Sequence, residues 1–476
     1  MPGSPHPLDY IFHPRSVAVV GVSGKQRDWG GGEMFVRALQ YMDFPGPIYP
    51  INPRAQEVLG LPCYPSLLDV PGPVDHVISS IPASAVLELM DHAAAKGVHS
   101  VHFFTAGFRE TGEEERIALE QEILRRARAA GVRIIGPNCM GLYCPAAKVA
   151  FARESPKESG NVAFISQSGL NAEEMIMYAS LRGVRFSKVV SYGNAVDLDE
   201  SDFLEYCAVD PETAIITTYI EGVKDGRRFL RALSAASAAK PLIVLKGGVT
   251  GAGSRAADSH TGSLAGSAQV WEAACRQAGA LTVQTLDELE DMAAAFSFLR
   301  RPAGRGVAIM GVGGGSSVLA ADAAEREGLS VPVLSEDLQA QLRQFTPVAG
   351  TSVRNPLDTV GIRAREQFLE AVRIAASSPD IHLLLIQSRI DWTPGSGQDS
   401  MEFVAQSVEA LEEAAKVASK PVVAVVWPPT SAETMSRVLA FQDRCARAGL
   451  PVFWGVHRAL HAVSRFLDWH EARSQC

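Results

Sequence analysis

One local pattern recurs along this chain: a short apolar strand, a turn of glycine and small polar residues, and then a helix with an apolar face. The first copy places its strand at residues 16–22, its turn at residues 21–24 and its helix at residues 33–41. A strand without polar alternation is typical of a parallel sheet that helices cover on both faces. The repeated pattern therefore predicts an α/β fold of mainly parallel sheets.

Two interruptions divide the pattern into three parts. Residues 148–159 are irregular and polar, and residues 300–306 form a linker that contains arginine, proline and glycine. We predict a Rossmann-like domain over residues 1–152, a second α/β domain over residues 153–299, and a third, flavodoxin-like domain over residues 300–476. A chain of 476 residues is long enough for three domains of ordinary size.

The first predicted domain places eight small or polar residues at the carboxyl ends of its strands. They are Gly21, Ser23, Gly24, Arg54, Ser80, Pro82, Thr105 and Asn138. Taken singly, each of these residues is also expected as an ordinary turn or cap. Ligands of open α/β sheets bind at this edge, so the shared position favours a single ligand groove.

Two features of this groove bear on which nucleotide it binds. The spacing Gly-x-Gly-x-x-Gly is absent from the first turn, and the second strand ends in Asn52, Pro53 and Arg54. An NAD site normally has an acidic residue at that point, where it holds the ribose hydroxyls. A cation there argues against NAD, and hence against a nicotinamide dehydrogenase. It favours a phosphate-bearing nucleotide such as coenzyme A.

A second candidate site surrounds one histidine. His260 lies in a run of small and hydroxylic residues, 256–266, downstream of a glycine-rich stretch. Small residues such as Gly262 let an anion approach the backbone, and hydroxyl and N–H groups donate to phosphate oxygens. An imidazole nitrogen can accept a phosphoryl group. From the residues alone, a solvated histidine in a glycine- and serine-rich loop is an equally good interpretation.

Two predicted helix starts offer further phosphate sites, because N-terminal amides and the helix dipole favour anions. The residues concerned are Ser166, Ser168 and Gly169 before one helix, and Gly313, Gly314 and Gly315 before the other. Glu221 follows a predicted strand at residues 214–219. It is either an exposed charge at the end of that strand or a functional carboxylate.

Several short motifs in this order along the chain resemble those of one family. They are Ser-Val-Ala-Val-Val-Gly-Val-Ser (16–23), Tyr-Pro-Ile-Asn-Pro-Arg (49–54), Gly-Pro-Asn-Cys-Met-Gly (136–141), Ser-Gln-Ser-Gly (166–169), Tyr-Ile-Glu-Gly (219–222), Ser-His-Thr-Gly-Ser-Leu-Ala-Gly (259–266) and Asn-Pro-Leu-Asp (355–358). Together they resemble the NDP-forming acyl-CoA synthetases, which include relatives of succinyl-CoA synthetase and the archaeal ADP-forming acetyl-CoA synthetases. The resemblance is weakest over the third domain.

The resemblance implies a role for each predicted domain. The first would bind coenzyme A, the second would be the succinyl-CoA-synthetase-like phosphohistidine domain, and the third would be a second succinyl-CoA-synthetase-like domain. His260 would carry the phosphoryl group, and Glu221 would hydrogen-bond the histidine and fix its tautomer. Arg54 stands where the family usually has lysine, which keeps the charge and changes its geometry.

The resemblance also implies a reaction and a partner. An acid, coenzyme A and ATP would give acyl-CoA, ADP and phosphate through an acyl phosphate and a phosphohistidine. The family binds ATP or ADP with Mg²⁺ on an ATP-grasp module, which this sequence lacks, so we expect a separate β subunit and an α2β2 complex. The alternative is a coenzyme A-binding regulatory or scaffold protein that has lost turnover. The intact His260 motif and Glu221 favour catalysis, because a pure binder needs neither.

Composition excludes several other classes. A net charge of −9 argues against a general nucleic-acid-binding role. The seven cysteines include no Cys-x-x-Cys pair, and we expect neither a metal site nor a redox motif. Residues 1–9 lack the pattern of a signal peptide, and no apolar run approaches the roughly 20 residues of a membrane span. We therefore expect a cytoplasmic protein.

Overall fold

We describe the protein from a computed structural model that covers residues 6–23, 31–261, 266–360, 362, 364–391 and 400–474, without the side chains of residues 258–261. The chain forms two compact units. Unit 1 comprises Met1–Ser180 and Arg185–Leu289, and unit 2 comprises Leu181–Val184 and Glu290–Cys476. Within the described residues, no helix combines the length and apolar character needed to cross a membrane.

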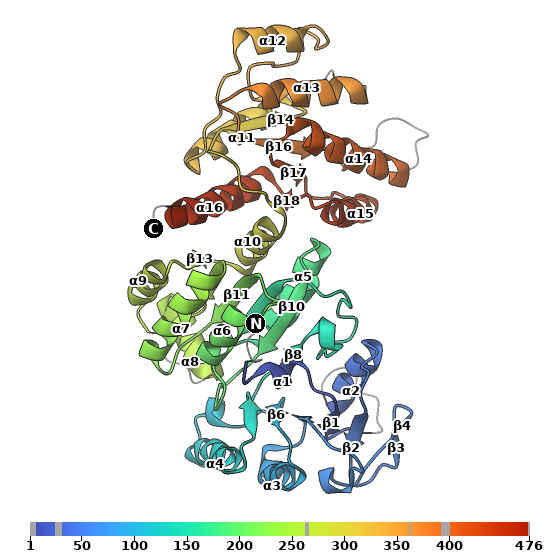
Figure 1. The fold of residues 1–476 in the computed structure, drawn as a ribbon, viewed down its shortest axis with the longest axis vertical. Helices are drawn as coiled ribbons and strands as arrows, with labels where there is room; N and C mark the ends of the chain where they lie inside the picture. The colour runs from blue at the N-terminus through green and yellow to red at the C-terminus, as the bar shows by residue number, and fades with distance from the viewer. Residues whose placement is uncertain are drawn as a thin grey trace, which may run out of the picture. The chain divides into compact units, whose positions relative to one another are not determined.

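The first sheet of unit 1 is parallel throughout (Figure 1). Its strands are β1 (Val17–Val20), β2 (Ile48–Ile51), β5 (His76–Ser79), β6 (Ser100–Phe103) and β7 (Arg133–Ile135), and a small hairpin of β3 (Glu57–Val58) and β4 (Leu61–Pro62) follows β2. The strand order is β2-β1-β5-β6-β7. The order therefore changes direction between β1 and β5, which is where ligands of such sheets bind.

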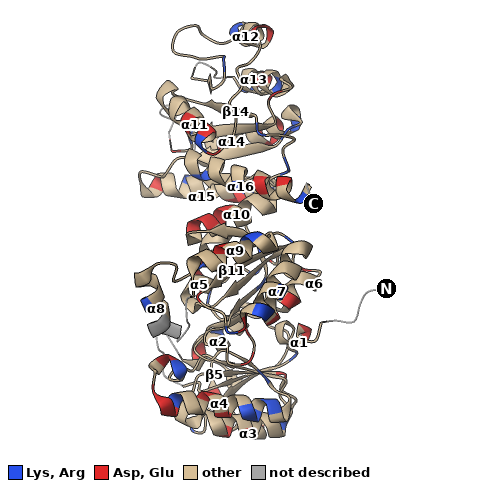
Figure 2. Cartoon of the chain, turned by 90° about the vertical axis from the view of Figure 1, so that its left-hand side faces the viewer, with Lys and Arg blue, Asp and Glu red and all other residues tan. Residues whose placement is uncertain are grey.

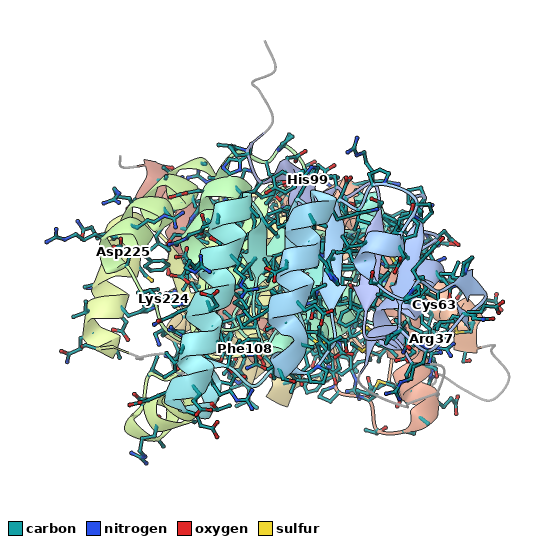
Figure 3. All side chains as sticks on the ribbon, turned by 90° about the horizontal axis from the view of Figure 1, so that it is seen from below. Arg37, Cys63, His99, Phe108, Lys224 and Asp225 are labelled. Carbon is teal, nitrogen blue, oxygen red and sulfur yellow. The ribbon has the colours of Figure 1, made fainter. Side chains whose placement is uncertain are left out.

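The helices of this part turn an apolar face inward and most of their charges outward, with Glu33 and Glu120 as buried exceptions. These helices are α2 (Gly32–Tyr41), α3 (Val86–Lys96) and α4 (Glu114–Ala130), with the 3-10 turns η1 (Leu67–Asp69), η2 (Ala83–Ala85) and η3 (Arg109–Thr111). Helix α3 ends at Gly97, a C-cap whose φ of +71° is the left-handed conformation that favours glycine. Phe103 and Phe108 are fully buried in the core, and Phe108 is labelled in Figure 3. Acidic and basic residues both lie along α4 (Figure 2).

The second sheet of unit 1 has one antiparallel edge strand. Its strands are β8 (Gly141–Tyr143), β9 (Val162–Ser166), β10 (Phe186–Ser191), β11 (Ile215–Ile220), β12 (Leu242–Lys246) and β13 (Leu281–Val283), with η4 (Pro145–Ala147) after β8. The order is β13-β12-β11-β9-β10-β8, and only β8 runs against its neighbour β10 among these strands. The chain passes from β7 to β8 through residues 136–140, so that turn joins the two sheets.

The helices around this sheet include a short one from the N-terminal segment. They are α1 (Asp9–Phe12), α5 (Gly169–Leu181), α6 (Glu200–Val209), α7 (Gly226–Ala239), α8 (Gly251–Thr261) and α9 (Ala268–Ala278). Helix α10 (Leu286–Phe298) begins in unit 1, and most of its residues belong to unit 2. Helix α1 packs on α6, where the ring of Phe12 stacks on that of Tyr206 at 4.6 Å. The Tyr206 hydroxyl also donates to the carboxylate of Asp9, at 3.0 Å. These contacts hold the beginning of the described chain against the second sheet.

Unit 2 contains a third parallel sheet. Its strands are β14 (Val307–Gly311), β15 (Leu357–Asp358), β16 (Leu383–Ser388), β17 (Val422–Val426) and β18 (Val452–Trp454), in the order β15-β14-β16-β17-β18. Its helices are α11 (Gly314–Arg326), α12 (Glu336–Arg343), α13 (Arg365–Ser377), α14 (Ser400–Ala418), α15 (Ala432–Arg447) and α16 (Val456–Ser474). The central strands β14, β16 and β17 are mainly apolar and are buried almost throughout, as is typical of a parallel sheet that helices cover on both faces.

The α/β fold with mainly parallel sheets is confirmed. One local expectation is wrong: the segment before His260 is helical rather than a loop, because α8 extends to Thr261. The Thr250 hydroxyl accepts the N–H of Gly253 at 3.1 Å, and the alanines at 256 and 257 are strong helix formers. His260 therefore belongs to the last turn of a helix. Gly262 lies outside the described residues.

Candidate functional site

A cavity of about 690 Å³ lies at the carboxyl edge of the first sheet, where the strand order changes direction. Its lining residues are Gly21, Val22, Ser23, Gly31, Glu33, Asn52, Ser80, Ile81, Pro82, Phe104, Thr105, Ala106 and Asn138. Six of the eight residues predicted for this groove are among them. Gly24 lies outside the described residues, and Arg54 does not line the cavity.

Close packing of two turns shapes the floor of this cavity. Gly21 has a φ of +94°, and a Cβ atom there would stand 2.6 Å from the carbonyl oxygen of Ser80. Only glycine fits such an approach of one backbone to another. The Thr105 hydroxyl lies 3.0 Å from that of Ser79 and donates to the carbonyl of Ile81 at 2.9 Å. The wall is thus formed by the ends of three adjacent parallel strands.

Two lining residues with polar side chains, Asn52 and Glu33, were not among the residues predicted for this groove. Asn52 ends β2, and its side-chain amide donates to the carbonyl of Val22 while its Oδ1 accepts the backbone N–H of Arg54 at 2.7 Å. The Glu33 carboxylate is buried and accepts the backbone N–H of Ser23. Asn52 stands in the quoted Asn-Pro-Arg motif, so its signal was present. Glu33 had no signal beyond its place at a helix start.

Arg54 occupies a different position from the one its charge suggested. It is exposed, two residues beyond Asn52, and the polar group that faces the cavity at the end of β2 is the amide of Asn52. The cavity therefore has a neutral amide where an NAD site has a carboxylate. A role for Arg54 in binding a phosphate at the rim stays a prediction.

The second candidate site is built on the second sheet, around Glu221. Strands β9 and β11 are neighbours, and Tyr219 pairs with Ser166. The side-chain oxygen of Gln167 accepts the backbone N–H groups of Glu221 at 2.8 Å and Gly222 at 3.2 Å. The structure thus brings Glu221 beside the predicted turn of Ser166, Ser168 and Gly169. Gln167 lies inside that motif, and the sequence analysis assigned it no role.

Glu221 is a buried residue rather than an exposed strand-end charge. Its side chain is held by the Tyr219 hydroxyl, which donates to Oε1 at 3.2 Å, and its backbone carbonyl accepts from Lys246 at 2.6 Å. Burial, followed by the Glu221 charge, raises the pKa of Tyr219. His260 lies further along the chain, in α8, but its side chain is outside the described part of the structure. The predicted Glu221–His260 hydrogen bond therefore stays a prediction.

Helix α5 begins at the predicted turn. Ser168 caps it, since its hydroxyl accepts the N–H of Asn171 at 3.3 Å, and the Ser166 hydroxyl donates to the Ser168 carbonyl at 2.7 Å. The helix of thirteen residues starts at Gly169. Its first amides therefore point out of the same turn that contacts Glu221.

The other predicted phosphate turn lies in unit 2. A cavity of about 590 Å³ is lined there by residues that include Gly314, Ser317, Thr351 and Asp358. The Asp358 carboxylate accepts the N–H of Gly313 at 3.2 Å, so this amide already has an anionic partner. Gly315 follows in the first turn of α11. Phosphate binding by this turn stays a prediction.

The first residue of α6, Glu200, has a buried carboxyl group. Glu200 is 3% exposed, and its Oε1 has no hydrogen-bond partner among the residues that the structure describes. Burial, and next the charge of Asp199, raise the pKa of Glu200 to about 8. Around neutral pH this side chain is therefore a neutral acid. Nowhere in the described ranges do three or more potential metal ligands cluster.

Glu200→Gln should stabilise the chain at alkaline pH. The folded carboxyl keeps its proton to about pH 8, whereas the unfolded one ionises near its ordinary pKa of 4.5, so wild-type stability falls as the pH rises between these values. At about 1.4 kcal/mol per pKa unit, a gain on the order of 2–4 kcal/mol is expected at pH 8. Urea unfolding at pH 5 and pH 8 measures it. The exposed Glu57→Gln is the control, and an unchanged pH dependence in Glu200→Gln would contradict the assignment.

Three family models match successive parts of the chain. They are described as a CoA binding domain over residues 15–145, a succinyl-CoA ligase like flavodoxin domain over residues 159–296, and a Ligase-CoA domain over residues 307–447. Each of the three sheets described above lies largely within one match. Together the matches cover most of the chain.

Similar proteins match most or nearly all of the chain. Subunit alpha of an ADP-forming acetate–CoA ligase I from Pyrococcus furiosus is 35% identical, over 98% of this chain and 99% of that protein. Subunit alpha of ligase II from the same organism is 40% identical, over 79% and 81%. The solved acetyl-coenzyme A synthetase 1 of Ca. Korarchaeum cryptofilum superposes with a TM-score of 0.82 at 33% identity, covering 98% of this chain and 97% of that one. The chain therefore belongs to the NDP-forming acyl-CoA synthetases, the family of ADP-forming acid–CoA ligases.

Proposed function

We propose that this chain is the catalytic α subunit of an ADP-forming acyl-CoA synthetase, which joins a carboxylic acid to coenzyme A with ATP. The observation that carries the proposal is the cavity at the carboxyl edge of the first sheet, within the segment that matches a CoA-binding domain. Family membership over the whole chain supports the same conclusion.

The residues of this cavity fit coenzyme A better than NAD. Its volume lies within the range of roughly 300–1,000 Å³ that is usual for cofactor sites. Asn52 replaces the carboxylate that would hold a free ribose diol, and Ser80, Thr105 and Asn138 add further polar groups. Glu33 brings one negative charge, which the N–H of Ser23 partly offsets. Coenzyme A would supply the thiol that receives the acyl group.

The second site would transfer the phosphoryl group. We propose that a ring nitrogen of His260 attacks the phosphorus of an acyl phosphate and that the carboxylate leaves, or that the same transfer runs in reverse. Glu221 would hold the other ring N–H so that one nitrogen stays free as the nucleophile. Gln167 fixes the backbone on which Glu221 stands. The amides at the start of α5 can stabilise the transferred charge, by about 0.3–2 kcal/mol through the helix dipole.

We further propose that ATP or ADP, with Mg²⁺, binds to a separate ATP-grasp β subunit, in an α2β2 complex. Two similar proteins are named alpha subunits, and this chain covers nearly the full length of one of them. The chain also lacks a Gly-x-x-x-x-Gly-Lys-Ser/Thr loop. The acid itself, and a preference for ATP or GTP, are open to direct assay with the assembled complex.

Calorimetry of the purified chain should detect binding of coenzyme A and none of NAD. Arg54→Glu should raise the Kd for coenzyme A about tenfold, because it replaces a cation near the cavity rim with an anion. Arg128→Glu makes the same charge change at the end of α4 and should leave the Kd unchanged. Tight NAD binding without coenzyme A binding would overturn the proposal. Binding of coenzyme A without any phosphorylation would favour the non-catalytic alternative.

A further inference from the structure

One loop joins the two candidate sites of unit 1. Residues 192–196 follow β10 and lie against the turn that carries Asn138: the N–H of Asn194 donates to the carbonyl of Pro137, and that of Val196 to the carbonyl of Gly136, both at 2.9 Å. A Cβ atom on Gly193 would stand 2.3 Å from the Pro137 oxygen. The loop and the turn are therefore in direct backbone contact, and Asn138 lines the cavity.

The side chain of Asn194 extends this contact to a second wall of the cavity. Its amide donates to Glu110 at 2.7 Å and to Glu120 at 3.1 Å. The other oxygen of Glu110 accepts the N–H groups of Gly107 at 2.6 Å and Phe108 at 3.1 Å. These residues directly follow Thr105 and Ala106, which line the cavity. Asn194 is fully enclosed, at 2% exposure, so these contacts are well defined.

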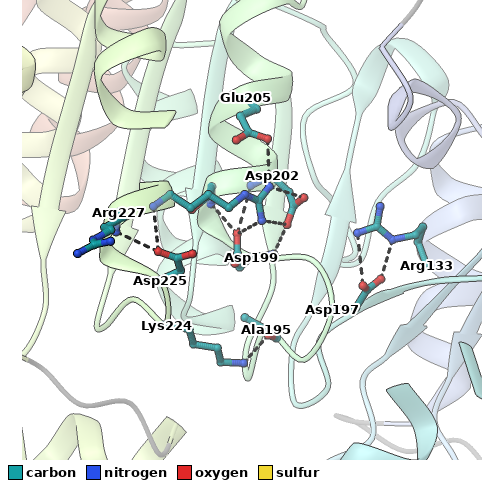
Figure 4. Close-up of polar contacts among 11 residues, drawn as sticks. Arg133, Ala195, Asp197, Asp199, Asp202, Glu205, Lys224, Asp225 and Arg227 are labelled. Atoms are coloured by element: carbon teal, nitrogen blue, oxygen red, sulfur yellow. Dashed lines mark hydrogen bonds and ion pairs between the residues drawn. The ribbon is translucent and has the colours of Figure 1, made fainter. Parts of the chain in front are cut away.

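A lysine holds the loop from the opposite side. Lys224 lies three residues after Glu221, and its ammonium group donates to the carbonyl of Asn194 at 2.9 Å and to that of Ala195 (Figure 4). Ala195 has a φ of +53°, a left-handed conformation that is unfavourable for a residue with a side chain. Two hydrogen bonds from a cation offset that cost. Lys224, which is labelled in Figure 3, is exposed as a whole residue.

The segment from Glu221 to Lys224 is thus fixed at both ends. Gln167 accepts the N–H groups of Glu221 and Gly222, and Lys224 donates to the loop that contacts the Asn138 turn. A chain of direct contacts runs from Glu221 through the loop to the wall of the cavity. We propose that Lys224 is a positioning residue that holds the Glu221 segment and the coenzyme A cavity in one fixed arrangement. The proposal rests on the function proposed above.

The chain offers a matched control for this role. Lys240 also donates to two backbone carbonyls, those of Cys207 and Asp210, both at 2.6 Å. Those carbonyls belong to the C-terminal end of α6, and Lys240 lies two residues before β12. This lysine is therefore at the amino edge of the same sheet. Removal of Lys240 therefore takes away the same kind of contact without touching the loop at 192–196.

Hydrogen exchange of the full chain tests, without any ligand, whether Lys224 holds the loop at residues 192–196 in place. In Lys224→Met, amides of residues 192–196, Gly136 and residues 138–140 should exchange roughly tenfold faster, as expected when two charge-assisted hydrogen bonds no longer oppose local opening. Lys224→Arg, which keeps the donors, should restore most of the protection. Lys240→Met should leave both segments unchanged. Unchanged exchange in Lys224→Met, or an equal increase in Lys240→Met, would overturn the proposal.

Calorimetry on the same proteins tests the link to the cavity. Lys224→Met should weaken coenzyme A binding by roughly threefold to tenfold although Lys224 does not line the cavity, and Lys224→Arg should recover it. Faster exchange with unchanged coenzyme A affinity would show that Lys224 holds the loop at residues 192–196 but does not affect the cavity. That result would refute the proposed link between the loop and coenzyme A binding. Failure of the wild-type chain to bind coenzyme A would instead refute the proposed function. Hydrogen exchange is measured without ligand, so its outcome tests the role of Lys224 separately from the proposed function.

Discussion

Incubation of the chain with acetyl-CoA and phosphate, or with ATP and the proposed β subunit, is expected to place one phosphoryl group on His260. Phosphate would attack the thioester, the C–S bond would break and coenzyme A would leave as the thiol. A ring nitrogen of His260 would then attack the phosphorus of the acyl phosphate, and the carboxylate would leave. The label should be stable in base and lost in mild acid, as a phosphorus–nitrogen bond to imidazole is.

His260→Asn is expected to abolish both the label and turnover, the largest effect of any substitution considered for activity. Coenzyme A binding should stay nearly intact, because α8 belongs to the second sheet and the cavity to the first. Glu221→Gln should slow phosphorylation without unfolding the chain, since an amide keeps the size of the side chain and removes its charge. An acid-stable label, or turnover by His260→Asn, would remove His260 from the mechanism.

Lys188→Met is expected to cause the largest loss of stability. Lys188 is 1% exposed, and its ammonium group lies 2.9 Å from the carboxylate of Asp210 and 2.5 Å from that of Glu212. Removal of the cation leaves Asp210 buried without its ionic partner, which typically costs about 3–5 kcal/mol. Thermal unfolding of the full chain measures the loss as a lower midpoint for the transition that includes unit 1.

An exposed ion pair provides the comparison. Lys157 contacts Asp43 at 2.8 Å, with side chains 46% and 68% exposed. Water screens such a pair, and Lys157→Met should therefore change stability by about 0–1 kcal/mol. The difference between the two variants isolates the effect of burial. Equal midpoints for Lys188→Met and Lys157→Met would show that the contacts of Lys188 with Asp210 and Glu212 contribute little to the stability of the chain.

Much of the local structure follows from the sequence. Wholly apolar strands such as β1 and β14 are buried on both faces because helices cover parallel sheets, and their composition alone predicts this. The C-cap at Gly97 was predictable for a similarly local reason. The residues after each strand were also identifiable as a common edge, because parallel strands end on the same side of their sheet. Six of the predicted residues therefore line one cavity.

Other features depend on contacts between distant segments, and no local pattern records them. Glu33 enters the cavity only because its helix starts beside the Ser23 turn.

What the sequence by itself determined is the class of fold, the edge at which ligands bind and the types of residue gathered there. Strand order, and with it the contact between residues 192–196 and the Asn138 turn, was decided only in the tertiary structure. The physical reason is that a lysine such as Lys224 finds its acceptors on backbone carbonyls. Every residue carries a carbonyl, so the amino-acid sequence does not distinguish the one that will be bound.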